Sequence, residues 1–79
     1  MKKILVVEDD PVNQMILSDF LTANGYQTVA ASTGPEGIER FEREAPDLLL
    51  GTLADGYLAK PFDLVQLLAQ VRQLLGEAA

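Results

Sequence analysis

The 79-residue chain contains no cysteine and no histidine. Without cysteine, no disulfide and no thiolate metal site can form, and without histidine the commonest general base and metal ligand is missing. Hydrolysis by a nucleophile paired with an imidazole base is therefore excluded. The sequence predicts a protein that is not an enzyme and that can hold a metal ion only through oxygen atoms.

Long apolar runs and positive charge are also scarce. The apolar run near the N-terminus covers only Ile4 to Val7, which is too short for a signal peptide or a membrane span. Twelve acidic against six basic residues give a net charge of −6, which repels the phosphates of nucleic acids. We expect a soluble, cytoplasmic protein that binds no nucleic acid and no membrane, and that prefers hard cations and basic protein surfaces.

Apolar residues make up 48% of the chain, which is enough for a hydrophobic core. A chain of this length is a single small domain, residues 1–79, near the lower limit for burying such a core alone. A partner chain is therefore expected.

The spacing of apolar residues predicts alternating strands and helices. Strands are expected at 4–7, 26–31, 47–50 and 56–59, and helices at 11–24, 34–44 and 63–75. The first strand shows no polar alternation, which is typical of a parallel strand covered on both faces. The order β-α-β-α-β-β-α predicts an α/β fold with a doubly wound parallel sheet.

Capping residues and apolar stripes define the helices more closely. Asp10, Thr33 and Asp63 are the expected N-caps, and Thr33 has Glu36 at capping-box spacing. Helix 34–44 carries a narrow apolar stripe of Ile38, Phe41 and Ala45, and is expected to bury that face. Met15, Phe20, Phe41 and the leucines of the last helix are assigned to the core.

The connection between the third and fourth expected strands is anomalous. Only residues 51–55 separate them, whereas a parallel crossover needs a dozen or more residues, usually including a helix. The fourth strand therefore cannot return as a parallel neighbour of the third strand within one chain.

Polar residues at the carboxyl ends of the strands are the candidates for chemistry, because open α/β sheets bind ligands there. Glu8 and Asp9 follow the first strand, Thr52 the third and Lys60 the last. Adjacent carboxylates repel one another unless a cation lies between them, and Mg²⁺ prefers oxygen ligands. The ammonium of Lys60 could balance a phosphoryl group beside such a metal ion.

Each of these candidates also has a purely structural interpretation. An acidic run at residues 8–10 suits the N-terminus of a helix, and for Asp10 the cap is the better interpretation. Lys60 could be a solvated loop lysine. Thr52 and Asp55 are equally well explained as turn residues in a glycine-rich connection.

Three stretches together, "KKILVVEDDPVNQMIL", "NGYQTVAASTGPEGIERFEREAPDLLL" and "ADGYLAKPFDLVQLLAQVRQLL", resemble the receiver domain of bacterial response regulators over nearly the whole chain. The most specific parts are "VVEDD" and "GYLAKPF". The resemblance implies a flavodoxin-like sheet of strand order 2-1-3-4-5, with helices 11–24 and 63–75 on one face and helix 34–44 on the other.

The resemblance also implies a site and partners. Glu8 and Asp9 match the acidic pair that positions Mg²⁺, with Asp9 as the direct ligand, and Lys60 matches the lysine that contacts the phosphoryl group. The partner would be a sensor histidine kinase or a phosphotransfer protein, whose histidine donates a phosphoryl group to an aspartate at the end of the third strand.

The chain departs from this family pattern after "PDLLL". Gly51 and Thr52 stand where the last apolar residue and the phosphoacceptor aspartate would fall, and the family's third helix, fourth strand and fourth helix are missing. We therefore expect a degenerate receiver of a two-component phosphorelay that is not phosphorylated and acts through protein–protein association. Two alternatives stay open: a receiver with a replacement carboxylate, such as Asp55 or one from a partner, and a natural or engineered truncation without a physiological role.

The missing elements predict a dimer. They leave the third strand without a neighbour and one sheet face largely uncovered, and such edges and faces associate. A symmetric homodimer is the least costly remedy. In the intertwined form that we expect, residues 57–59 join the sheet of the second copy, and the crossing segment is Gly51, Thr52, Leu53, Ala54, Asp55 and Gly56.

Overall fold

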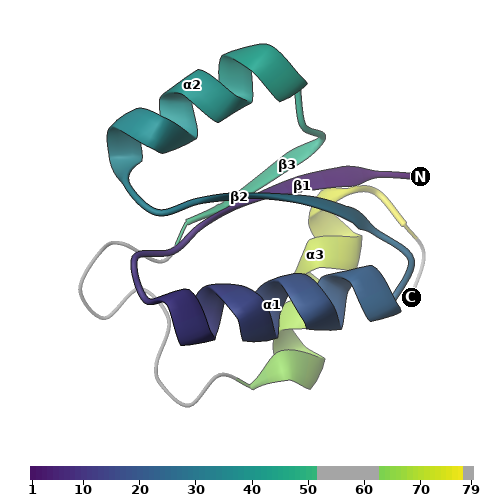
Figure 1. The fold of residues 1–79 in the computed structure, drawn as a ribbon. Helices are drawn as coiled ribbons and strands as arrows, with labels where there is room; N and C mark the ends of the chain where they lie inside the picture. Colours follow the sequence, from purple (N-terminus) through teal and green to yellow (C-terminus); the bar gives the residue numbers. More distant parts are fainter. Residues whose placement is uncertain (52–62, 78–79) are drawn as a thin grey trace.

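The structure, a computed structural model, describes residues 1–51 and 63–77. Three strands, β1 (Lys3–Val7), β2 (Gln27–Ala31) and β3 (Leu48–Gly51), form one parallel sheet of order β2-β1-β3 (Figure 1). The helices are α1 (Pro11–Ala23), α2 (Gly34–Glu44) and α3 (Leu64–Leu74). The α/β parallel architecture is confirmed, with every predicted end within one residue of the observed one. The strand expected at 56–59 lies outside the described residues.

The central strand is the most deeply buried part of the chain. Ile4, Leu5 and Val6 are 0% exposed. β1 pairs with β2 on one side and with β3 on the other, so that Val7 lies opposite both Ala31 and Gly51. The unbroken apolar run of β1 is therefore that of a strand covered on both faces.

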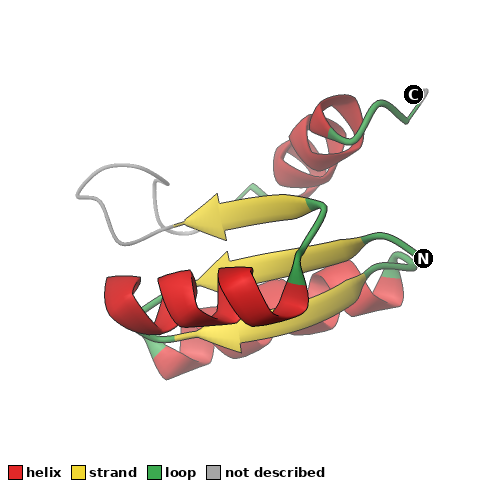
Figure 2. Ribbon diagram, turned by 90° about the horizontal axis from the view of Figure 1, so that it is seen from above, coloured by secondary structure: helices red, strands yellow, loops and turns green. Residues whose placement is uncertain are grey.

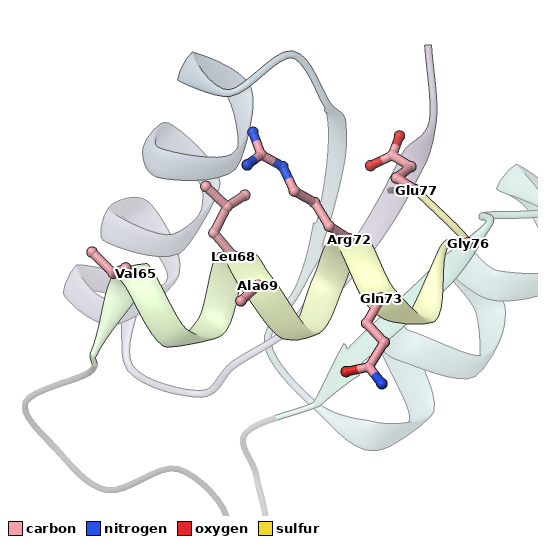
Figure 3. Close-up of a pocket in the computed structure, with 7 residues that line it drawn as sticks. All are labelled: Val65, Leu68, Ala69, Arg72, Gln73, Gly76 and Glu77. Atoms are coloured by element: carbon pink, nitrogen blue, oxygen red, sulfur yellow. The ribbon is translucent and has the colours of Figure 1, made fainter. Parts of the chain in front are cut away.

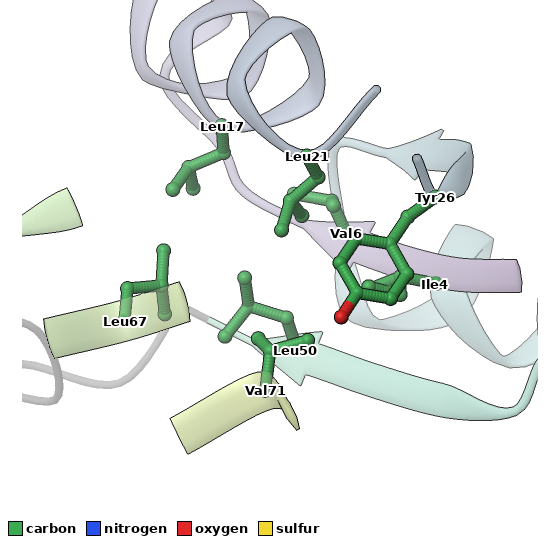
Figure 4. Close-up of a cluster of buried hydrophobic side chains, with 8 residues drawn as sticks. All are labelled: Ile4, Val6, Leu17, Leu21, Tyr26, Leu50, Leu67 and Val71. Atoms are coloured by element: carbon green, nitrogen blue, oxygen red, sulfur yellow. The ribbon is translucent and has the colours of Figure 1, made fainter. Parts of the chain in front are cut away.

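The two faces of the sheet carry different helices. α1 and α3 lie on one face and α2 lies on the other (Figures 1 and 2), as the resemblance implied. The α1 and α3 face holds the larger core, in which side chains from the sheet, α1 and α3 meet Tyr26 (Figure 4): Ile4, Val6, Leu17, Leu21, Tyr26, Leu50, Leu67 and Val71. On the α2 face, Leu5, Val7 and Ala31 form a smaller cluster.

The helix N-termini are capped as predicted. Asp10 Oδ1 accepts a hydrogen bond from Val12 N at 2.9 Å, and Asp63 Oδ1 accepts one from Gln66 N at 3.1 Å. Thr33 Oγ1 accepts from Glu36 N at 3.2 Å. These side chains satisfy amide groups that have no partner within a helix. Across the described ranges, no helix has the length and apolar character needed to cross a membrane.

Several core assignments are wrong: Met15, Phe41 and Leu74 are exposed, and so are Ile38 and Ala45 of the stripe that α2 was expected to bury. Met15 is 57% exposed, because α1 packs on the sheet through Leu17 and Leu21 instead. α1 is apolar around much of its circumference, so spacing alone did not show which stripe faces the sheet. Phe41 is 48% exposed, because α2 lies over β2 and β1 and no helix in the described ranges covers β3 on that face. Phe20 does pack against the core, as do Leu64, Leu67, Leu68 and Leu75 near the C-terminus.

Candidate functional site

The carboxyl ends of the three strands meet at one edge of the sheet. The register places Val7 opposite Gly51, so Glu8 and Asp9 follow directly beside the end of β3. The acidic pair and Gly51 are thus neighbours at the edge where open α/β sheets bind ligands. The other candidate positions lie outside the described residues: Thr52, Leu53, Ala54, Asp55, Gly56 and Lys60.

The two acidic residues differ sharply in their surroundings. Glu8 is 0% exposed, and its backbone N–H donates to Ala31 O at 3.0 Å, which extends the contact between β1 and β2 beyond the last strand residue. Asp9, one residue later, is exposed. Asp9 is therefore the member of the pair whose carboxylate is accessible to a hydrated ion.

Gln14 stabilises this edge of the sheet, a role that the sequence did not predict. Its side-chain Nε2 donates to Glu8 O at 3.2 Å and to Ala31 O at 3.1 Å. It therefore joins the end of β1 to the end of β2 and fixes the start of the loop that carries Asp9. The available signal was its position, since Gln14, Leu17 and Leu21 follow the three- and four-residue spacing of one helix face.

The donor set of the acidic pair suits a weakly held Mg²⁺. Mg²⁺ is usually bound through one or two carboxylates and keeps several waters, so Glu8 and Asp9 have the required chemistry. Residues 1–51 and 63–77 contain no group of three or more acidic, histidine or cysteine residues placed to hold a metal ion. Because Glu8 is buried and Asp9 is the accessible carboxylate, most of the coordination shell would be left to water.

A groove lies along α3, apart from the acidic edge of the sheet (Figure 3). It is lined by Val65, Leu68, Ala69, Arg72, Gln73, Gly76 and Glu77, and neither Glu8 nor Asp9 contributes to it. The groove is thus separate from the acidic pair, and the residues lining it include none of the predicted site residues.

Tyr26 ties this C-terminal region to the sheet. Its buried hydroxyl donates a hydrogen bond to the carboxylate of Glu77. That hydrogen bond raises the pKa of Tyr26 above 10.0, burial raises it further, and Arg72 acts in the opposite direction. A neutral phenol held in this way stabilises the docked α3 and offers no group for catalysis at neutral pH.

Comparison with known proteins identifies the class. The chain forms an open parallel α/β sheet with acidic residues at its carboxyl edge. Its sequence matches the family model of the response regulator receiver domain over residues 4–53. The match covers more than half of the chain, and the chain belongs to the response regulator receiver domain family. It ends just after β3, where the sequence departs from the family pattern.

Particular relatives define how much of a receiver is present. The polar-differentiation response regulator DivK of Brucella ovis is 33% identical over 49 residues, which are 62% of this chain and 40% of the relative. DivK of Brucella abortus strain S19 gives the same values. The matched part of the chain thus spans 40% of the length of these curated relatives.

Solved structures match over a longer stretch. A receiver-modulated diguanylate cyclase from Pelobacter carbinolicus superposes with a TM-score of 0.85 and 25% identity, over 96% of this chain and 97% of that one. A receiver domain protein from Clostridium thermocellum gives a TM-score of 0.66 and 20% identity, over 92% of this chain and 59% of that one. The protein is a truncated receiver domain with a flavodoxin-like fold.

Proposed function

We propose that this protein is a degenerate receiver of a two-component phosphorelay, which does not accept a phosphoryl group and acts through protein–protein association. The observation that carries the proposal is the end of β3. Gly51 lies beside the acidic pair at the carboxyl edge of the sheet, and the next residue in the sequence is Thr52. No carboxylate follows β3 directly.

The chemistry of the remaining groups supports this proposal. A threonine hydroxyl is a weak nucleophile unless an adjacent base takes its proton, and the chain has no histidine. Glu8 and Asp9 would hold Mg²⁺ weakly, and Lys60 would contact a phosphoryl group. Without an acceptor these groups have no covalent product to stabilise, and we assign the chain no enzymatic activity.

Association with a kinase or phosphotransfer protein is supported by the outer surface of α1. Val12 and Met15 are each 57% exposed and Ile16 is 40% exposed, and all three follow closely after Asp9. Exposed apolar residues grouped beside a ligand-binding edge are typical of an interaction surface. A sensor histidine kinase or a phosphotransfer protein of the same pathway is the partner we propose for it.

Association with a second copy is supported by β3. In the described part of the chain, β1 is the only strand that pairs with β3. We propose an intertwined homodimer of the single domain 1–79, in which residues 51–56 cross between copies and residues 57–59 join the partner's sheet. α3 packs against the core through Leu67 and Val71, and Glu77 beyond its end accepts a hydrogen bond from Tyr26.

Incubation with acetyl phosphate and Mg²⁺, followed by intact mass measurement, tests the proposal. We expect no added phosphoryl group, while an ordinary receiver treated in parallel gains one. A phosphorylated product would overturn the proposal. If that product is lost in Asp55→Asn, the replacement-carboxylate alternative is the correct one, with Asp55 as the acceptor.

A further inference from the structure

The α2 face of the sheet leaves an apolar surface open beside β3. Leu49 of β3 is 49% exposed, and Ile38 and Phe41 of α2 are 64% and 48% exposed. We call these three residues the β3 patch. Single exposed apolar residues are ordinary, but a group of large ones on one face indicates a binding surface.

The position of α2 explains why these residues belong together. Gly37 packs against Val7 of β1, and the guanidinium Nε of Arg40 donates to Ala30 O of β2 at 3.3 Å. α2 therefore lies over β1 and β2 and leaves β3 clear, as Figure 2 shows from the α2 side. At helical spacing, Ile38 and Phe41 fall on the side of α2 opposite Arg40, which is the side that borders β3.

The surroundings of the β3 patch are acidic. Glu42 follows Ile38 by one helical turn and is exposed, and Asp47 is exposed just before β3, where its carboxylate accepts a hydrogen bond from Lys3 N at 2.8 Å. The nearby cations have partners of their own: Arg40 contacts β2, Arg43 pairs with Glu39 at 2.9 Å, and the ammonium of Lys3 pairs with Glu44 at 3.2 Å. The chain as a whole has a net charge of −6. The β3 patch is therefore an apolar surface bordered by acidic side chains.

We propose that the β3 patch binds an amphipathic helix of another protein, whose apolar face is flanked by lysine and arginine. The faces of sheets in α/β folds are covered by helices, so a helix is the element expected to cover β3 beside α2. Basic flanks complement Glu42 and Asp47, and this complementarity guides the encounter as well as the fit. This surface is distinct from the exposed α1 residues Val12, Met15 and Ile16, and it is independent of whether the chain accepts a phosphoryl group.

A second copy of the chain suits the β3 patch less well. The outward side of α2 carries Glu42 and the Glu39–Arg43 ion pair, so two copies meeting at this face would place charged side chains against Leu49. Burying charged groups against apolar ones is costly even when they are paired. In the intertwined dimer the partner contributes a strand to the edge of β3, which leaves the face above β3 open to a helix.

The experiment uses a fluorescent helical peptide of leucine and lysine, with leucines at positions i, i+3, i+4 and i+7. Binding to the full chain is measured by fluorescence anisotropy, and the contact residues are mapped by amide chemical shifts. We expect Phe41→Ser and Leu49→Ser to weaken binding by about tenfold or more. Both positions are half exposed, so the variants should keep the fold, which their circular dichroism spectra check.

Val65→Ser is the matched control, because Val65 is 80% exposed on α3, which lies on the other face of the sheet. Its affinity for the peptide should equal that of the unaltered chain, and a leucine–glutamate peptide should bind about tenfold more weakly than the lysine peptide. Equal affinity of all variants, a loss confined to Val65→Ser, or equal binding of the glutamate peptide would each overturn the proposal. So would light scattering in which Phe41→Ser splits a dimer, since a second copy would then occupy the patch.

Discussion

The two faces of the sheet carry similar apolar side chains but are covered to very different degrees. On one face, Leu50 meets Leu67 and Val71 of α3 and is 9% exposed. On the other face, the adjacent Leu49 is 49% exposed because α2 lies over the other two strands. The apolar pattern of β3 is thus that of a strand covered on both faces, although within residues 1–51 and 63–77 only one of its faces carries a helix.

The sharpest comparison of the faces uses these two neighbouring leucines. Leu50→Ala should lower the free energy of unfolding by about 2–4 kcal/mol, because it removes buried methyl groups and leaves a cavity. Leu49→Ala should cost less than about 1 kcal/mol, because the side chain is half exposed already. Urea unfolding followed by circular dichroism measures both. Equal costs would show that the α2 face is covered in solution and would remove the contrast between the faces.

The close contact of α2 with the sheet gives the next largest effect. A Cβ atom at Gly37 would lie 2.9 Å from Val7 Cγ2, and Val7 is a buried, β-branched side chain whose χ1 angle is restricted. Gly37→Ala should therefore destabilise the fold by about 1–3 kcal/mol through overpacking. Gly34→Ala is the control, since no atom lies within 4 Å of the Cβ position there. A Gly37→Ala variant as stable as Gly34→Ala would mean that α2 sits further from β1.

The smallest effect concerns Tyr26 on the α1 and α3 face. The hydrogen bond to Glu77 raises the pKa of Tyr26 above its unfolded value of 10.0, so its contribution to stability is complete below that pH and is lost as the pH rises through the folded value. Stability measured from about pH 8 to about pH 11 should thus fall less steeply in Tyr26→Phe than in the unaltered chain. Glu77→Gln should reduce the slope as well. An unchanged slope in both variants would contradict the coupling.

Local chemistry made much of the fold predictable. The caps at Asp10, Thr33 and Asp63 are short-range features, and the unbroken apolar run of β1 predicted a strand covered on both faces. The exposure of Phe41 was not predictable in the same way, because it depends on whether another helix covers β3, and the described part of the chain has none on that face. The resemblance implied which face of the sheet each helix covers. The apolar stripe of α2 gave no information on which elements would pack beside that helix.

The candidate site shows the same division between local and long-range information. The rule that parallel strands align their carboxyl ends predicted the position of Glu8 and Asp9 at this edge, where the structure places Gly51 beside them. The role of Gln14 was missed, because its bonds to Glu8 O and Ala31 O join segments that are distant in sequence. A polar residue within a buried helical stripe was the one available clue.

The central claim is that a receiver without its third helix, fourth strand and fourth helix completes its sheet with a second copy. Multi-angle light scattering at micromolar concentration tests this claim most directly. We predict a particle with twice the 8.6 kDa mass of one chain, whose circular dichroism spectrum is that of a folded protein. A compact, folded particle with the mass of a single chain would contradict it.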